Sequence, residues 1–208
     1  IDGKIAVSKD YFTINKNFKW ITNKLSRSRA HLIRSEYGAI ISTSKSINND
    51  NSLLNCRLNG FDKSKPDLIV IDIALKLKKT LKLLKKNFSR KIYIVTSIKN
   101  EKKINFFKKK GIKFIYVNSL KTKKEFTNLF KILKKYNYNR ILIESGLVFL
   151  NSLLDYRLIS NLYIFKSSFK LQKKGLNNTS NKFIKKLKLT KKIIVNLDKD
   201  TLIKARIK

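Results

Sequence analysis

Short apolar runs separated by polar turns recur along the chain and predict buried β-strands. Runs of this length that are rich in β-branched residues favour extended structure, because branched side chains pack well on a pleated surface. They lie at residues 39–41, 68–71, 92–95, 114–117, 141–143 and 162–165. The pattern therefore predicts a sheet built from short, buried strands.

Apolar residues three and four positions apart fill the intervening segments and predict helices. We expect these helices over residues 23–36, 101–110, 123–136 and 147–154. The second has the clearest end, because three lysines at 108–110 precede Gly111. A basic last turn with a glycine beyond it is typical of a helix C-terminus. Since strands and helices alternate, the sequence predicts the α/β class.

The pattern changes near the carboxyl end of the chain. Strand-like runs at residues 192–197 and 201–207 have no helix between them, which predicts an antiparallel hairpin or edge pair with residues 198–200 in the turn. Residues 171–181, which contain Gly, Asn, Ser and Thr, are expected to form an exposed loop. Neither a repeat nor an interdomain linker is visible, so we expect one domain over residues 1–208, with its first strand truncated at Ile1.

The charge raises the question of a nucleic-acid partner. The chain holds 49 Lys and Arg against 13 Asp and Glu, a formal net charge of +36, and a basic RNA-binding module is one interpretation of such a balance. However, the lysines are spread along the whole chain among Asn, Ile, Phe and Tyr, and they do not cluster beside stacking aromatic residues. We therefore expect no specific nucleic-acid partner, although the charge should strengthen binding of a phosphorylated ligand.

Candidate metal and redox chemistry is limited by residue counts. The chain has one cysteine, Cys56, and one histidine, His31, so an internal disulfide and a zinc site with the usual His and Cys ligands are excluded; no metal is expected and both residues are interpreted as structural. A Gly-rich dinucleotide fingerprint and a Walker-type loop are also missing. With no secretory signal and no apolar run of about 18 residues, we expect a cytoplasmic protein without a membrane partner.

Several short motifs carry more information than the composition. Asp2-Gly3-Lys4-Ile5-Ala6 is followed by Lys19-Trp20-Ile21-Thr22, then by a helix with Arg34, a polar segment at residues 46–57 that we expect to be a loop, and the strand end Ile143-Glu144-Ser145-Gly146. In this order and spacing they resemble the pyrimidine reductase domain of the bifunctional riboflavin-biosynthesis deaminase/reductase family. The resemblance runs from Asp2 to about Phe165. Its motifs are weak one by one and specific together.

The resemblance implies a dihydrofolate-reductase-like fold, with a mixed, mostly parallel central sheet flanked by helices and an antiparallel C-terminal hairpin. It also implies NADPH-dependent reduction of 5-amino-6-(5-phosphoribosylamino)uracil, a phosphoribosylamino-pyrimidine, to the ribitylamino compound, by a homodimer. The family's zinc deaminase half needs His-x-Glu and Pro-Cys-x-x-Cys, which this sequence lacks. A deaminase domain, if the gene encodes one, would therefore lie upstream of Ile1.

Site residues follow from the same motifs. Lys4 and Glu144 are the implied catalytic pair, placed to manage the charge or proton that develops as hydride is transferred. Substrate binding is implied for Arg34, Leu54, Arg57 and Glu144, because guanidinium groups match phosphate oxygens in pairs. Cofactor binding is implied for Ala6, Trp20, Ser46, Asp50, Gly146, Leu147 and Val148.

Simpler interpretations of these residues stay open. Lys4, Arg34 and Arg57 could be solvated charges, Trp20 a half-buried core aromatic, and Gly146 a helix-entry glycine. Asp50 could be an ordinary turn residue. The sequence also departs from the family pattern at Phe18, Ser52 and Ile73, which puts one substrate contact and one cofactor contact in doubt. Another dihydrofolate-reductase-like NADPH reductase is the alternative enzyme, although its acidic substrate-binding residue has no counterpart on the first helix.

Overall fold

The structure is a computed structural model that describes residues 21–61, 65–85, 90–168 and 188–207. Its contacts divide the chain into two compact units, one of residues 31–149 and one of residues 1–30 together with 150–208. That the two make one domain stays a prediction, and the loop expected at residues 171–181 lies outside the described residues.

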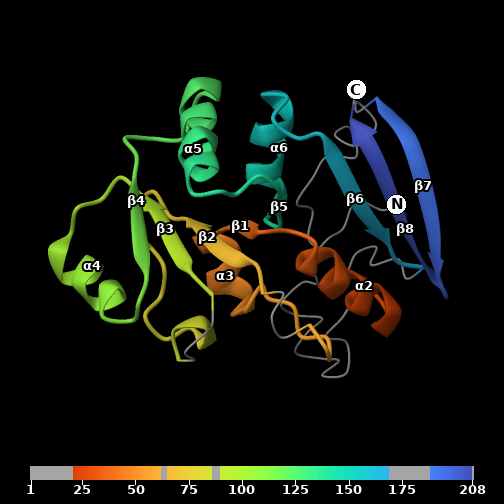
Figure 1. The fold of residues 1–208 in the computed structure, drawn as a ribbon, viewed down its shortest axis with the longest axis horizontal. Coiled ribbons are helices and arrows are strands. Elements are labelled where there is room, and N and C mark those ends of the chain that lie inside the picture. Colours follow the sequence, from red (N-terminus) through yellow and green to blue (C-terminus); the bar gives the residue numbers. More distant parts are fainter. Residues whose placement is uncertain (1–20, 62–64, 86–89, 169–187, 208) are drawn as a thin grey trace, which may run out of the picture. The chain divides into compact units, whose positions relative to one another are not determined.

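The unit of residues 31–149 is built on a parallel five-stranded sheet (Figure 1). Its strands in spatial order are β4 (Lys113–Tyr116), β3 (Ile92–Thr96), β2 (Asp67–Ile71), β1 (Ala39–Thr43) and β5 (Ile141–Ile143). From β1 the chain adds β2, β3 and β4 in one direction and then returns to place β5 on the other side of β1. The carboxyl ends of β1 and β5 thus form the switch point of the topology, where open α/β sheets bind ligands.

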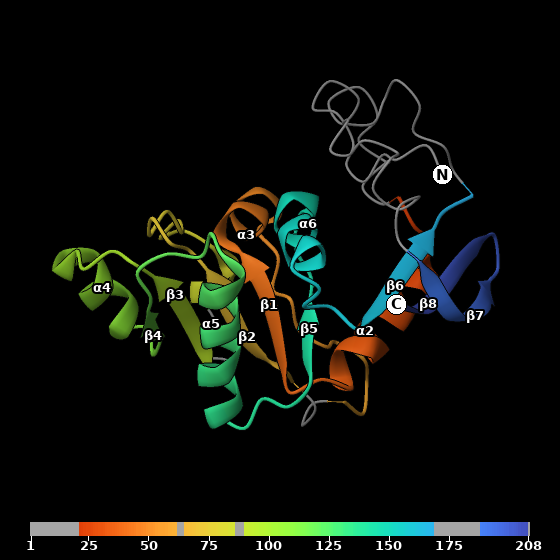
Figure 2. The ribbon, with the colours of Figure 1, turned by 90° about the horizontal axis from the view of Figure 1, so that it is seen from above.

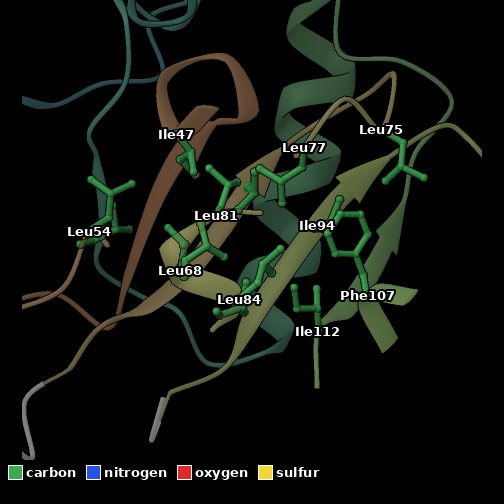
Figure 3. Close-up of a cluster of buried hydrophobic side chains, with 14 of the residues drawn as sticks. Ile47, Leu54, Leu68, Leu75, Leu77, Leu81, Leu84, Ile94, Phe107 and Ile112 are labelled. Carbon is green, nitrogen blue, oxygen red and sulfur yellow. The ribbon is translucent and has the colours of Figure 1, made fainter. Parts of the chain in front are cut away.

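Alternating side chains of the strands fill two cores, one on each face of this sheet. Ile41 and Ile69 pack on one face with Leu129 and Leu133 of α5 (Lys123–Lys135). The opposite face is covered by α3 (Ser44–Asp50), by α4 (Glu101–Lys108) and by the segment around η1 (Lys82–Leu84). Figure 1 shows α5 above the strands and α3 below them, and Figure 2, seen from above, shows α5 in front of the strands. Figure 3 shows the second core, which includes Ile47, Leu68, Ile94 and Phe107.

Local sequence signals explain where the helices of this unit begin and end. The Thr122 side chain accepts the Glu125 N–H, and the Glu125 carboxylate accepts the Thr122 N–H, a capping box that starts α5. Helix α4 ends before Gly111, whose φ of 77° is a left-handed conformation that glycine adopts without strain. The predicted helix end at Gly111 is therefore confirmed.

The other unit contains an antiparallel three-stranded sheet, in which β8 (Asp200–Ile207) pairs with both β6 (Asn161–Lys166) and β7 (Leu189–Leu197). Helix α2 (Lys24–Ser35) begins in this unit, where the buried carboxylate of Asp200 accepts the N–H of Asn23 and the hydroxyl of Ser26. Helix α6 (Leu147–Asp155) ends in it. Among the described residues no helix has the length and apolar character needed to cross a membrane.

The predicted strands and helices all occur within the described residues, and the α/β class with an antiparallel carboxyl-terminal hairpin is confirmed. Two details differ. The polar segment at residues 46–57, expected as a loop, begins inside α3, which the Thr43 hydroxyl caps by accepting the Ser46 N–H. Strand β6, expected in the sequence of central strands, pairs with the C-terminal hairpin instead, so the antiparallel part of the fold forms a sheet of three strands.

Candidate active site

The clearest feature of the candidate site is a two-point ion pair between Arg34 and Glu144. Arg34 Nε donates to Glu144 Oε2 at 2.8 Å, and Arg34 Nη2 donates to Glu144 Oε1 at 2.5 Å. The side chain of Arg34 is only 14% exposed and that of Glu144 37%. A guanidinium that meets a carboxylate through two parallel hydrogen bonds fixes its orientation as well as its charge. The two residues therefore form one unit.

Backbone elements bring this pair together from distant parts of the sequence. Arg34 lies in the last turn of α2. Glu144 follows β5 directly, and its N–H donates to the carbonyl of Ile41 at 2.9 Å, which continues the pairing of β5 with β1. Glu144 is thus held at the switch point by the sheet itself, on the side of β1 where the strand order reverses.

A second group of contacts surrounds the main chain of Asn55. Its carbonyl oxygen lies 3.0 Å from His31 Nδ1 and accepts a hydrogen bond from Arg34 Nη1 at 3.2 Å. Its side-chain oxygen accepts from Arg57 Nη1 at 2.9 Å, and Arg57 Nη2 lies 3.2 Å from His31 Nε2. The two arginines that the sequence motifs single out are therefore linked through Asn55 and His31.

The charges of this group act on one another. Burial works against the charge of Arg34, but the hydrogen bonds and charge of Glu144 outweigh it and raise the pKa of Arg34. Burial lowers the pKa of Arg57, and the neighbouring charge of Arg34 lowers it further. The pKa of His31 is lowered by burial and then by the charges of Arg34 and Arg57. The site is cationic, with one carboxylate against one of its two guanidinium groups.

Arg90 holds the loop that carries Asn55 and Arg57 through hydrogen bonds to its main chain. Arg90, 8% exposed, donates from Nη1 to the carbonyls of Leu54 at 2.6 Å and Pro66 at 3.2 Å, and from Nη2 to the carbonyl of Leu53. Leu54 has a φ of 47°, a left-handed conformation that costs a branched residue of order 1–3 kcal/mol. The Arg90 guanidinium offsets that cost by satisfying carbonyl groups that would otherwise be buried without donors.

Four of the residues predicted to bind a cofactor follow the ends of β1 and β5: Ser46, Gly146, Leu147 and Val148. The N–H of Gly146 donates to Ser46 Oγ at 3.1 Å, and Ser46 Oγ also lies 3.1 Å from the hydroxyl of Thr43. Helix α6 starts at the next residue, Leu147, and Val148 in its first turn is 79% exposed. Gly146 has no left-handed backbone, and a Cβ there would meet Ser46 Oγ at an ordinary 3.6 Å. Its glycine is therefore not required by local packing.

Two further predicted residues have different surroundings. Asp50 ends α3, and burial together with the charge of Glu144 raises the pKa of its carboxyl. Leu54, predicted to bind substrate, turns its side chain into the hydrophobic core with Ile47 and Leu68 (Figure 3). A substrate contact by Leu54 would therefore have to involve its main chain, and it stays a prediction.

Some of the sequence-based predictions fall outside the described residues: Lys4, Ala6, Trp20 and the departure at Phe18. The structure in turn adds residues that the motifs did not indicate. His31 carried a signal, because it precedes Arg34 by three positions and so shares its helix face. Asn55 acts largely through its carbonyl oxygen, and Arg90 reaches main-chain atoms from a different strand end, so neither left a side-chain pattern in the sequence.

A parallel sheet with polar and charged residues at its switch point defines an open α/β protein, and the carboxyl ends of its strands are its candidate ligand site. The family model described as the RibD C-terminal domain matches residues 1–203, and the chain belongs to this family. The riboflavin biosynthesis protein RibD of Aquifex aeolicus (strain VF5) is 28% identical over 206 residues, which are 98% of this chain and 54% of that protein. The chain thus spans about half the length of this curated relative.

Solved structures agree with this assignment at the level of the fold. RibD of Acinetobacter baumannii, form 1, has a TM-score of 0.75 at 21% identity, covering 100% of this chain and 55% of that one. A Thermotoga maritima protein described as a diaminohydroxyphosphoribosylaminopyrimidine deaminase/5-amino-6-(5-phosphoribosylamino)uracil reductase has a TM-score of 0.72 at 20% identity, covering 100% and 54%. The dihydrofolate-reductase-like fold expected from the motifs is therefore shown.

Proposed function

We propose that this chain is a pyrimidine reductase domain that uses NADPH to reduce the ribose of 5-amino-6-(5-phosphoribosylamino)uracil to a ribityl chain. The observation that carries the proposal is the group of Arg34, Arg57 and Glu144 at the switch point, in a member of the RibD C-terminal domain family. The description of the Thermotoga maritima protein names a 5-amino-6-(5-phosphoribosylamino)uracil reductase. A phosphorylated sugar needs a cationic group held in a fixed direction, and the Arg57 guanidinium, bound to Asn55 and His31, offers one.

In this proposal Arg57 binds the substrate and Arg34 holds Glu144. Arg34 donates two hydrogen bonds to Glu144 and a third to the Asn55 carbonyl, so its geometry suits positioning of the carboxylate. Arg57 is on the exposed side of the group, with two of its contacts directed to Asn55 and His31. Glu144 then accepts a hydrogen bond from a polar group of the substrate beside the carbon to be reduced, and Lys4 is its proposed catalytic partner.

The residues at the ends of β1 and β5 fit a dinucleotide in the chemistry of their donor set. Hydroxyl groups of Thr43 and Ser46 and the N–H of Gly146 lie within one hydrogen-bonded group, beside the start of α6. NADPH would supply the hydride. Ser46 and Gly146 would hold it from this group, Asp50, Leu147 and Val148 would contribute from the adjoining helices, and Ala6 and Trp20 from the amino-terminal motifs.

A direct test is the oxidation of NADPH by the purified chain, followed by its absorbance, with and without the phosphoribosylamino-pyrimidine. We expect oxidation only when the substrate is present, and a lower rate with NADH. Dihydrofolate as the substrate tests the alternative reductase. If the chain fails to oxidise NADPH with the pyrimidine and instead binds one RNA sequence tightly at physiological salt, the basic-module interpretation replaces this one; non-specific RNA binding should collapse between low and physiological salt.

The remaining expectations belong to the same proposal. A homodimer, a cytoplasmic location and the absence of a specific nucleic-acid partner are proposed on the strength of the family and of the dispersed charge. Light scattering of the purified chain measures its oligomeric state, and this measurement does not require an active enzyme.

A further inference from the structure

We propose that His31 is a positioning residue for the substrate: a neutral imidazole, protonated at Nδ1, that fixes the guanidinium of Arg57 against Asn55. The effect on substrate binding rests on the proposed function, whereas the contact of His31 with Asn55 and Arg57 rests on the geometry alone. His31 lies on the last turns of α2, three residues before Arg34. The motifs of the sequence had assigned it no role beyond a structural one.

The contacts of the imidazole allow one arrangement of its protons. Nδ1 lies 3.0 Å from the carbonyl oxygen of Asn55, which can only accept, so Nδ1 has to donate. Nε2 lies 3.2 Å from Nη2 of Arg57, which can only donate, so Nε2 has to accept. A neutral ring with its proton on Nδ1 satisfies both contacts at once.

The third contact of the ring agrees with this assignment. Arg34 Nη1 lies 3.3 Å from Nδ1, but a protonated Nδ1 cannot accept from it. The same Nη1 group lies 3.2 Å from the Asn55 carbonyl, which can accept from both Arg34 and His31 through its two lone pairs. Arg34 and His31 therefore share one acceptor, the Asn55 carbonyl oxygen, so both neighbouring donors are satisfied.

The surrounding charges favour the neutral ring. The charged groups that act on His31 are the guanidinium groups of Arg34 and Arg57 and, more weakly, the carboxylate of Glu144. Burial and the two positive charges lower the pKa of His31. A second proton on the ring would remove the acceptor at Nε2 and place a third cation between two others.

Two fixed contacts determine how Arg57 is presented. Its Nη1 donates to the Asn55 side chain in the same loop, and its Nη2 donates to His31 on α2. These two hydrogen bonds set the plane of the guanidinium. A guanidinium has five N–H donors in one plane. Fixing two of them directs the others, and a preorganised donor binds an anion with less loss of side-chain freedom.

Paired substitutions separate the two ring nitrogens. In His31→Gln the amide oxygen reaches the place of Nε2 and can accept from Arg57, whereas in His31→Asn the shorter amide reaches only the place of Nδ1 and can donate only to Asn55. We expect KM for the pyrimidine to rise about ten-fold in His31→Asn, the effect of losing one hydrogen bond to a charged group. His31→Gln should stay within about two-fold of the wild type, with kcat and NADPH affinity unchanged in both variants. Equal KM values for the two variants would overturn the positioning role.

A measurement that needs no activity tests the contact itself. Because the chain has a single histidine, nitrogen NMR of the labelled protein at pH 7 reports the His31 ring alone. We expect a protonated Nδ1 and an unprotonated Nε2, and a rise of the His31 pKa in Arg57→Ala. A proton on Nε2, or a His31 pKa that does not respond to Arg57→Ala, refutes the inference even in an active enzyme. Should the chain prove inactive while these NMR results hold, the proposed function fails and the His31–Arg57 contact stands.

Discussion

Arg34 and Glu144 are 110 residues apart in the sequence and are joined by two hydrogen bonds. The sequence motifs implied substrate binding for Arg34, and both catalysis and substrate binding for Glu144, but the geometry makes each residue the partner of the other. An arginine that is mostly buried beside a carboxylate at a strand end neutralises it, orients it and depends on it. The effect of changing either residue therefore has to be predicted for the pair.

Glu144→Gln removes the negative charge with little change in shape. We expect kcat to fall about 10²-fold or more, as for loss of a positioned group that handles charge or a proton in the reaction. Because Arg34 would keep its charge without a counterion, the free energy of unfolding should fall by about 1–2 kcal/mol. Steady-state kinetics and urea unfolding measure the two effects. Glu36→Gln, which removes the same charge from an exposed site, is the control, and a similar loss of kcat in that variant would contradict the assignment.

Arg57→Ala should weaken use of the pyrimidine by about ten- to a hundred-fold in kcat/KM, the effect of losing a charge-assisted hydrogen bond worth about 1.5–3 kcal/mol. NADPH affinity, measured by titration of the free protein, should barely change. Arg57→Lys should recover little, because an ammonium group cannot hold two directed contacts as the planar guanidinium does.

The matched control for Arg57→Ala is Arg140→Ala, which removes an equal charge from an exposed arginine over the ring of Tyr37. If both variants lower kcat/KM to the same extent, the effect comes from the overall positive potential of the chain and not from a directed contact. If neither does, the substrate lies elsewhere.

Arg90→Lys should destabilise the protein more than its surface counterpart Arg140→Lys. The Arg90 guanidinium serves the carbonyls of Leu53, Leu54 and Pro66 together, and a lysine ammonium cannot reach all three positions in a plane. Loss of one or two buried hydrogen bonds to a charged group predicts a decrease of about 2–3 kcal/mol in the free energy of unfolding. Thermal and urea unfolding of the two variants give the comparison, and equal stabilities would show that the loop does not depend on this side chain.

The stability of the protein should depend on pH through His31. In the folded protein its pKa lies below the ordinary value of 6.5, so the unfolded chain binds this proton more readily than the folded one. The contribution of a neutral His31 is therefore complete above pH 6.5, and it is lost as the pH falls from there toward the folded pKa. We expect the free energy of unfolding to fall more steeply between pH 7.5 and about 5.5 in the wild type than in His31→Gln. Parallel curves for the two proteins would contradict this.

Local signals in the sequence predicted most of the elements, and the failures have physical reasons. The end of α4 at Gly111 was predictable because a left-handed glycine is a local requirement. Helix α3 was missed, because its seven mostly polar residues bury only Ile47 and depend on the Thr43 cap and the sheet beneath. Strand β6 was predicted, but its neighbours were not, since the pairing with β8 is fixed by contacts about forty residues away that no local pattern contains.

The candidate site divides in the same way. Motif spacing found Arg34, Arg57, Ser46, Glu144 and Gly146, and the structure brings them together in two hydrogen-bonded groups. Motif spacing could not find Asn55 or the buried Arg90, because both act through main-chain carbonyl groups, which every residue type has. Nor could it tell that Arg34 and Glu144 would bind each other before either meets a ligand.

The return of β5 to the free side of β1 has a consequence for the order of folding. Strands β1 to β4 join neighbours that follow one another in the chain, so they can assemble progressively, whereas β5 has to close a loop of about 100 residues. Until it does, β1 presents an unpaired edge, and the carboxylate partner of Arg34 and the N–H donor to Ser46 are both missing. The parallel sheet becomes complete in the same step that assembles the site, which makes slow closure of β5 the stage at which this protein is most exposed to aggregation.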